Sequence, residues 1–332
     1  MGSQDMVGVG SGLFPVAHSV FSAETLVAEV TRDYAVATPC AFRLLRRGLN
    51  DTYILNTQDE RYIVRVYGAS WRTGPDVAYE LELLGHLASR QVPASVPVAA
   101  RDGSLSRQVC APEGARHLVM FTYARGTPLW WTDEHGQLAG RMLAAIHTAS
   151  DDFVSKHARF QMDLEYLIDR PLAAIRPFLI HRPEDLSYLE RFAGELKVQA
   201  AEAVRAGLDW GVCHGDFGGN IHIADRALTV FDFDLCGSGW RAYDFVVPLW
   251  AARSKKRTSI WDAFVRGYTE RRRLGAADLE AIQLFSPIRH LWTTGIRLSN
   301  LVHWGILPLI NGHLEHSLKS FREWEVNHMV GR

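Results

Sequence analysis

The segment 212–234 constrains this chain more than any other stretch. It contains His-Gly-Asp, then Asn220, then two short strand-like apolar runs separated by an Ala-Asp-Arg turn, and it ends in Phe-Asp-Phe-Asp. Two strands joined by a tight turn form a hairpin, and a hairpin brings its two ends together. The sequence therefore predicts that Asp216 and Asn220 lie beside Asp232.

These side chains are of the types that phosphoryl transfer requires. A carboxylate such as Asp216 can orient and deprotonate a hydroxyl, while Asn220 and Asp232 offer oxygen ligands for a Mg²⁺ ion on nucleotide phosphates. Asp and Asn are also common turn formers, and His-Gly-Asp occurs by chance. The combination and its spacing, rather than the tripeptide, therefore favour a functional site.

The combination resembles the aminoglycoside phosphotransferase and choline kinase-type phosphotransferase family, an atypical branch of the protein-kinase-like fold. Type II homoserine kinases and a bacterial stress-response Ser/Thr kinase belong to the same family. The resemblance covers about residues 18–325. It implies an α+β, two-lobed fold in which a small antiparallel β-sheet lobe precedes a large, mainly helical lobe, with ATP lying between them.

The resemblance also implies a division of the chain and a set of roles. We expect a flexible N-terminal lead at 1–17, a nucleotide-binding lobe at 18–123, and a helical lobe with the catalytic loop and the acceptor site at 124–332. Asp216 is then the catalytic residue. The expected Mg²⁺ ligands are Asn220, Asp232 and Asp234.

The loop after Asp216 departs from the family pattern. Family members usually place the Asn five residues after the Asp, whereas Asn220 lies four residues after Asp216 and Ile221 takes the usual position. The two glycines before Asn220 allow the backbone to compensate. His222 is a weaker candidate for the same metal position.

Three strands in meander are expected near the N-terminus, at residues 41–47, 52–55 and 61–67, after a helix that Ser22 caps. In the family, ATP phosphates lie under the first turn, residues 48–51, although a plain hairpin turn has the same appearance. The residues implied in nucleotide binding there are Asn50, Asp51 and Thr52.

Arg65 lies in the third of these strands, where kinases of this fold usually have a Lys that bridges the nucleotide phosphates. Glu80 lies on the apolar face of an amphipathic helix predicted at 76–89, and a carboxylate there needs a partner. We expect Glu80 to pair with Arg65, with Glu82 as the second candidate. The alternatives are a solvent-facing Arg65 and a solvated Glu80 at the edge of the face.

A strand ending at His117–Tyr123 runs into a Gly/Pro break, as at a hinge between lobes. The resemblance places the adenine edge against the hinge backbone at Phe121, Thr122 and Tyr123. The chain beyond the hinge is predicted to be mostly helical, with helices at 133–148, 164–178, 185–206, 260–272, 277 to about 302, and 312–328. His147 is interpreted as a packed structural histidine, and Asp244 as a residue that caps or pairs locally and holds the His-Gly-Asp loop.

Composition narrows the function further. A net charge of −1 gives no basic surface for nucleic acid or an anionic membrane, and no apolar run reaches the roughly 20 residues of a membrane helix. The four cysteines have neither disulfide-framework nor zinc spacing and suit reduced thiols. We therefore expect a cytoplasmic protein without a nucleic-acid or membrane partner.

The resulting hypothesis is an ATP- and Mg²⁺-dependent kinase that transfers the γ-phosphate to a hydroxyl of a small molecule. The acceptor classes left open are an antibiotic, another natural product, and an amino alcohol such as homoserine. Tryptophans and arginines near the C-terminus disfavour a polycationic acceptor. The candidate polar contacts to the acceptor in this region are Arg289, His290, Arg297, Asn300 and His303. The alternatives are a protein Ser/Thr kinase of the stress-response type and a nucleotide-binding pseudokinase-like module.

Overall fold

The computed structural model describes residues 14–328 and confirms the predicted α+β class. Most of the predicted N-terminal lead therefore lies outside the described residues. The chain divides into two compact units, residues 1–73 with 99–120 and residues 74–98 with 121–332. The segment 74–98, which the sequence placed with the N-terminal part, thus packs with the second unit. No helix in the described range has the length and apolarity to cross a membrane.

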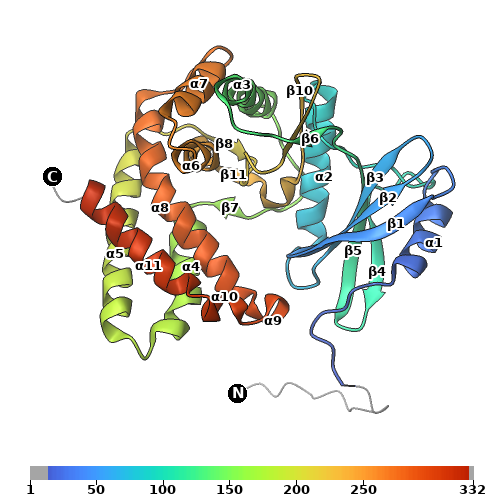
Figure 1. Ribbon diagram of the computed structural model, residues 1–332, viewed down its shortest axis with the longest axis horizontal. Coiled ribbons are helices and arrows are strands. Elements are labelled where there is room, and N and C mark those ends of the chain that lie inside the picture. The colour runs from blue at the N-terminus through green and yellow to red at the C-terminus, as the bar shows by residue number, and fades with distance from the viewer. Residues whose placement is uncertain (1–13, 329–332) are drawn as a thin grey trace. The chain divides into compact units, whose positions relative to one another are not determined.

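The first unit contains an antiparallel five-stranded sheet in the order β1-β2-β3-β5-β4, with helix α1 (Ala23–Asp33) (Figure 1). Ser22 caps α1, because its hydroxyl accepts from the N–H of Thr25. The predicted meander of the first three strands is confirmed. The strands are β1 (Ala41–Arg47), β2 (Asn50–Asn56), β3 (Arg61–Tyr67), β4 (Arg107–Ala111) and β5 (Gly114–Thr122).

Strand β2 begins earlier than expected, at Asn50, so the connection from β1 is the dipeptide Gly48-Leu49. The strand starts there because Asn50 pairs with Tyr67 of β3, and a buried ion pair lies beside it: Arg116 on β5 donates to the Asp51 carboxylate at 2.8 Å, and both side chains are fully buried. Arg116 also donates to the carbonyl of Tyr67 at 2.8 Å, and His18 lies 3.2 Å from the same carboxylate. A buried charge needs such partners, so Asp51 is fixed in the sheet.

The second unit is mainly helical. Helices α3 and α7 pack closely because they meet at glycines: a Cβ on Gly140 would lie 2.0 Å from the carbonyl oxygen of Phe264. Helix α8 is buried on most of its surface and packs against α4, α5, α6 and α11. The larger helices are α2 (Gly74–Ser89), α3 (Asp133–Ala149), α4 (Arg170–Ile175), α5 (Pro183–Arg205), α6 (Val246–Ser254), α7 (Thr258–Thr269), α8 (Ala276–Ser299) and α11 (His313–His328).

Two departures from the predicted helices occur here. The region predicted as one helix at 164–178 comprises a π-helix η1 (Glu165–Asp169), then α4, then a 3₁₀ turn η2 (Arg176–Leu179). The helix predicted to continue to residue 302 ends at Ser299 and is followed by the short helices α9 (Leu301–Trp304) and α10 (Leu307–Ile310). Gly305, with a φ of +74°, separates these two short helices.

Two small sheets carry the central motif. One has the order β10-β9-β6 and the other β7-β11-β8. The strands are β6 (Thr127–Pro128), β7 (Gln161–Met162), β8 (Trp210–Cys213), β9 (Ile221–Ala224), β10 (Ala227–Val230) and β11 (Gly237–Trp240), with 3₁₀ turns η3 (Phe233–Leu235) and η4 (Arg241–Phe245). Strand β8 leads directly into His-Gly-Asp, so this sheet positions the loop.

Candidate active site

The predicted hairpin is confirmed and brings the motif together. Strands β9 and β10 pair in antiparallel register from Ile221 opposite Val230. The turn residues Asp225 and Arg226 both have positive φ, as in a type I′ turn. Beyond the last pair, the N–H of Phe231 donates to the carbonyl of Asn220 at 3.0 Å. Asp232 is therefore one residue from a direct contact with Asn220.

The carboxylate of Asp244 holds the His-Gly-Asp loop, as predicted. One carboxylate oxygen accepts the N–H of His214 at 2.7 Å and the other accepts the N–H of Gly215 at 2.8 Å. Gly215 has a φ of +82°, and a Cβ there would lie 2.3 Å from the carbonyl oxygen of Leu235. Only glycine fits this turn, because both its conformation and its surroundings exclude a side chain.

His147 is buried and structural, which confirms its interpretation. Its Nε2 lies 3.2 Å from Asp244 and its Nδ1 lies 2.9 Å from the hydroxyl of Tyr268. Burial lowers the pKa of His147 and raises that of Tyr268, so a neutral imidazole accepts from a phenol and donates to Asp244. Burial alone would raise the pKa of Asp244, but its hydrogen bond with His147 and the surrounding donors hold that pKa below its usual value.

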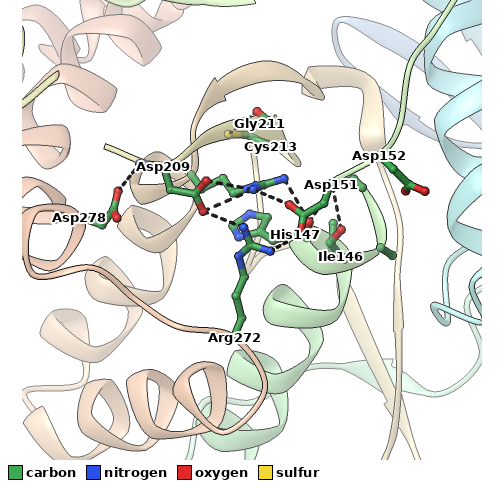
Figure 2. Close-up of polar contacts among 12 residues, drawn as sticks. Ile146, His147, Asp151, Asp152, Asp209, Gly211, Cys213, Arg272 and Asp278 are labelled. Carbon is green, nitrogen blue, oxygen red and sulfur yellow. Dashed lines mark hydrogen bonds and ion pairs between the residues drawn. The ribbon is translucent and has the colours of Figure 1, made fainter. Parts of the chain in front are cut away.

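An ion-pair network fastens the chain just before strand β8, and Figure 2 shows Asp209, Asp151 and Arg272 within it. Arg272 donates to Asp151 at 2.6 Å and to Asp209 at 3.0 Å. Arg241 contacts the same two carboxylates at 2.8 and 3.1 Å and donates to the carbonyl of His147 at 3.1 Å. The end of α3, the loop after α7 and the start of β8 are thus tied together.

Asp216 combines exposure with firm hydrogen bonding. Its side chain is 38% exposed. One carboxylate oxygen accepts from the amide of Asn220 at 2.9 Å, and the other is bound by the guanidinium of Arg289. Arg289 also donates to the carbonyl of Gly215 at 2.6 Å. The carboxylate therefore reaches the surface while both of its oxygens are held.

The shortened loop turns Asn220 toward Asp216. The amide nitrogen of Asn220 donates to both the carbonyl and the carboxylate of Asp216, at 3.1 and 2.9 Å. Both amide hydrogens are then used, so the side-chain oxygen is the atom of Asn220 left to bind a cation. His222, the weaker candidate, instead has its Nδ1 2.6 Å from the carbonyl of Ala124.

Asp232 has a left-handed backbone, with φ 64° and ψ 61°. This conformation is costly for a residue with a Cβ and is found preferentially at functional positions. Asp234 lies in η3 and is buried. Among residues 14–328, no group of three or more His, Cys, Asp or Glu could hold a metal by itself. A cation here would need Asn220 and ligand oxygens besides the carboxylates, which suits Mg²⁺.

Arg65 and Glu80 are both buried, so the solvent-exposed alternatives are wrong. Arg65 is 7% exposed, lies opposite Thr52 across β2 and β3, and points its guanidinium at the hydroxyl of Tyr67, 3.5 Å away. Glu80 is fully buried on α2, a helix that packs against η3 within the second unit. The predicted pairing of Arg65 with Glu80 stays a prediction.

The other residues implied in nucleotide binding have defined local contacts. Asn50 accepts the N–H of Gly68 at 3.3 Å, and Asp51 belongs to the ion pair with Arg116. At the predicted hinge, the N–H of Thr122 donates to Val96 at 2.9 Å. Phe121 lies opposite Pro97, and Tyr123 packs edge-on against His222. The roles of these residues toward a nucleotide stay predictions.

Helix α8 also carries His290, which the sequence analysis named among the polar residues near the C-terminus. The half-buried ring of His290 packs against Phe321, with ring centroids 4.8 Å apart, and its role as a polar contact stays a prediction. Burial, together with the charges of His316 and Arg297, lowers its pKa to about 4. The folded protein therefore holds His290 neutral across a pH range in which an unfolded chain would protonate it.

We predict that His290 makes the protein acid-sensitive. The pKa of His290 is lower in the folded protein than in the unfolded chain, so the unfolded chain binds more protons between about pH 6.5 and 4. The free energy of unfolding therefore falls as the pH drops through that window. The loss is at most about 3 kcal/mol. Urea unfolding at pH 7 and pH 4.5 should show a smaller acid loss for His290→Gln than for wild type. The exposed His313→Gln should behave as wild type, and equal acid losses in all three proteins would contradict the prediction.

A cavity of about 700 Å³ lies elsewhere in the second unit, beside α3 and β10. Its lining includes Met142 and Leu228 on the apolar side and Arg141 and Arg271 on the charged side. None of the predicted site residues lines it.

The fold and this loop together define a kinase-type phosphotransferase. Residues 42–281 match the phosphotransferase enzyme family, and the chain belongs to that family. The expected family and fold are thus confirmed, and the protein is a phosphotransferase.

Relatives extend over most of the chain. An uncharacterized protein of Deinococcus radiodurans is 37% identical over 95% of this chain and 93% of its own length. A homoserine kinase of Brucella anthropi is 29% identical over 77% of this chain and 78% of its own.

Solved structures give the same fold. The microcompartment-associated aminopropanol kinase has a TM-score of 0.69 at 25% identity, over 82% of this chain and 88% of that one. An amicoumacin kinase in complex with AMP-PNP and Ca²⁺ has a TM-score of 0.73 at 17% identity, over 91% and 94%. At that identity the second likeness concerns the fold alone.

Proposed function

We propose that the protein is an ATP- and Mg²⁺-dependent kinase that phosphorylates a hydroxyl of a small molecule. The observation that carries this proposal is the placement of Asp216 and Asn220 in a firmly bonded loop, with Asp232 brought beside them by the hairpin. A carboxylate base next to oxygen ligands for a cation is what phosphoryl transfer to an alcohol needs. The named kinases among the relatives support the same reaction class.

In this proposal Asp216 accepts a hydrogen bond from the acceptor hydroxyl and orients its oxygen toward the γ-phosphorus. It takes the proton as the phosphate ester forms, while the bond between the γ-phosphorus and the β–γ bridging oxygen breaks and ADP leaves. Asp232 and the side-chain oxygen of Asn220 would hold Mg²⁺, with Asp234 as an auxiliary ligand. The ion would supply charge neutralisation on the phosphates. Most of the acceleration then comes from positioning and electrostatics rather than covalent chemistry.

The nucleotide residues of the proposal are those that the family pattern implies. Arg65 binds the phosphates through its guanidinium, and Glu80 supports it. The buried state of both side chains supports these roles, because a buried charge is costly without a partner. The backbone at Asn50, Asp51 and Thr52 approaches the phosphates, and the backbone at Phe121, Thr122 and Tyr123 binds the adenine.

For the acceptor we propose a small amino alcohol. Homoserine kinases recur among the relatives, and the aminopropanol kinase is the structural relative at 25% identity. Both names describe short molecules that carry one hydroxyl and one amine. An antibiotic is the next class to test, because the amicoumacin kinase and a spectinomycin phosphotransferase have the same fold.

The test is transfer of label from [γ-³²P]ATP with Mg²⁺ to homoserine, 1-amino-2-propanol, choline, spectinomycin and a protein extract in separate reactions. We expect label in at least one small molecule with wild type and none with Asp216→Asn. Asp216-dependent label in the protein fraction alone would favour the Ser/Thr kinase. Tight ATP binding without transfer to any acceptor would favour the pseudokinase-like module.

A further inference from the structure

Arg289 is a buried cation beneath the catalytic loop. Its side chain is 4% exposed on the most buried stretch of α8, and its guanidinium lies 5.2 Å from the ring of Tyr243 and 5.8 Å from that of Trp250. Burial alone would lower its pKa, but Tyr243 and the nearby carboxylates raise it, so the guanidinium remains charged. A charge at such a depth needs a specific partner.

The partner is the loop itself. One arm of the guanidinium donates to the carboxylate of Asp216, and the other donates to the carbonyl of Gly215 at 2.6 Å. Two rigidly linked donors to consecutive residues fix the direction as well as the distance of the carboxylate. A planar fork can do this, whereas the single ammonium of a lysine cannot hold both acceptors in the same geometry.

The contacts of Arg289 and Asn220 leave part of the Asp216 carboxylate exposed. Arg289 approaches from the protein interior and Asn220 approaches along the loop, while 38% of the Asp216 side chain stays exposed. The loop N–H groups are held separately by Asp244. Donors from Asn220 and Arg289 therefore set the orientation in which Asp216 meets an acceptor hydroxyl.

We propose that Arg289 is a positioning residue for Asp216 in the phosphoryl-transfer reaction. This inference rests on the proposed function, since it assigns Arg289 a role in the step that Asp216 performs. Arg289 donates to the loop, so in this proposal it acts on the rate by fixing the direction of the Asp216 carboxylate. Misplacement of a reacting group by about 1 Å costs on the order of 100-fold in rate.

The experiment compares wild type, Arg289→Met, Arg289→Lys and a matched control, Arg322→Met. Arg322 also pairs with an aspartate, Asp185 at 2.5 Å, and also lies over a tyrosine, Tyr188 at 4.5 Å, but on helices α5 and α11 away from the loop. For Arg289→Met we expect kcat to fall about 100-fold, with ATP affinity unchanged within about twofold. Arg289→Lys should recover part of the rate, and Arg322→Met should keep all of it.

A further readout separates positioning from a general loss of folding. In an Asp216→Asn background, Arg289→Met should change the residual rate by less than about threefold, since the two residues act as a unit. A full additional loss in that background, or wild-type kcat in folded Arg289→Met, would overturn the inference.

A double-mutant cycle of urea unfolding with Arg289→Met and Asp216→Asn tests the contact without any activity. The two changes should be coupled by at least about tenfold in the unfolding equilibrium constant. If wild type phosphorylates no acceptor, the proposed function fails, and the cycle still decides whether Arg289 holds Asp216. Additive effects in the cycle would refute the contact even in an active enzyme.

Discussion

Asp216→Asn should reduce phosphoryl transfer by about 10³-fold while leaving ATP binding close to wild type. An asparagine has nearly the same shape, so it keeps the size of the loop side chain, but its amide cannot take the proton of the acceptor hydroxyl. General base catalysis of this kind contributes roughly 10²–10⁴-fold. The measurement is kcat from initial rates with labelled ATP, beside ATP affinity from calorimetry.

The matched control is Asp225→Asn at the tip of the β9–β10 hairpin. Asp225 is exposed and has a φ of +48°, a conformation that asparagine also adopts readily. We expect its rate to equal that of wild type. An Asp216→Asn protein that binds ATP and keeps more than about a tenth of the rate would exclude Asp216 as the base.

Asp244→Asn should weaken both folding and catalysis. The buried carboxylate accepts from His147 and from two loop N–H groups, whereas an asparagine has one acceptor oxygen and turns an NH₂ group toward a donor. Leaving buried donors unpaired next to a neutral amide should cost about 3 kcal/mol of unfolding free energy. With the loop displaced, we expect kcat to fall about 100-fold. Urea unfolding and initial rates measure the two effects.

The stability loss caused by Asp244→Asn should depend on pH in a definite direction. The pKa of Asp244 is lowered in the folded state, so its contribution is complete above the ordinary carboxyl range and is lost as the pH falls through the lowered folded pKa. The stability difference between wild type and Asp244→Asn should therefore be constant from about pH 6 to 8 and shrink in strong acid. Asp262→Asn, an exposed change on α7, should alter neither stability nor rate. A pH-independent difference down to about pH 2 would contradict this account.

Local patterns predicted much of this molecule. Short strand-like runs between turns located β1 and β3, helical spacing located α2 and α3, and the Ala-Asp-Arg turn located the hairpin. The same hairpin argument placed Asp232 beside Asn220, because only short-range geometry was needed. His147 and Asp244 were also interpreted correctly as structural residues, from their match to family positions.

Long-range partners were not predictable in the same way. The phosphate role of Asp51 stays a prediction, whereas its ion pair with Arg116, on a different strand, had no local signal in the sequence. Arg289 appeared as one of several polar residues on a C-terminal helix, and nothing local indicates that it bonds to Asp216. The hydrogen bond from the Asn220 amide to Asp216 likewise depends on the conformation of the shortened loop, which Arg289 and Asp244 hold. Such contacts are properties of packing, not of periodicity.

The supports of the His-Gly-Asp loop come from widely separated parts of the chain. His147 lies before the loop in sequence, Asp244 shortly after it, and Arg289 far beyond it on α8. During synthesis the loop therefore emerges from the ribosome well before its last anchor has been made. A chain that ends before α8 lacks Arg289, so the Asp216 carboxylate and the Gly215 carbonyl lose the donor that holds them from that helix. The loop is therefore complete only when the polypeptide has been made as far as α8.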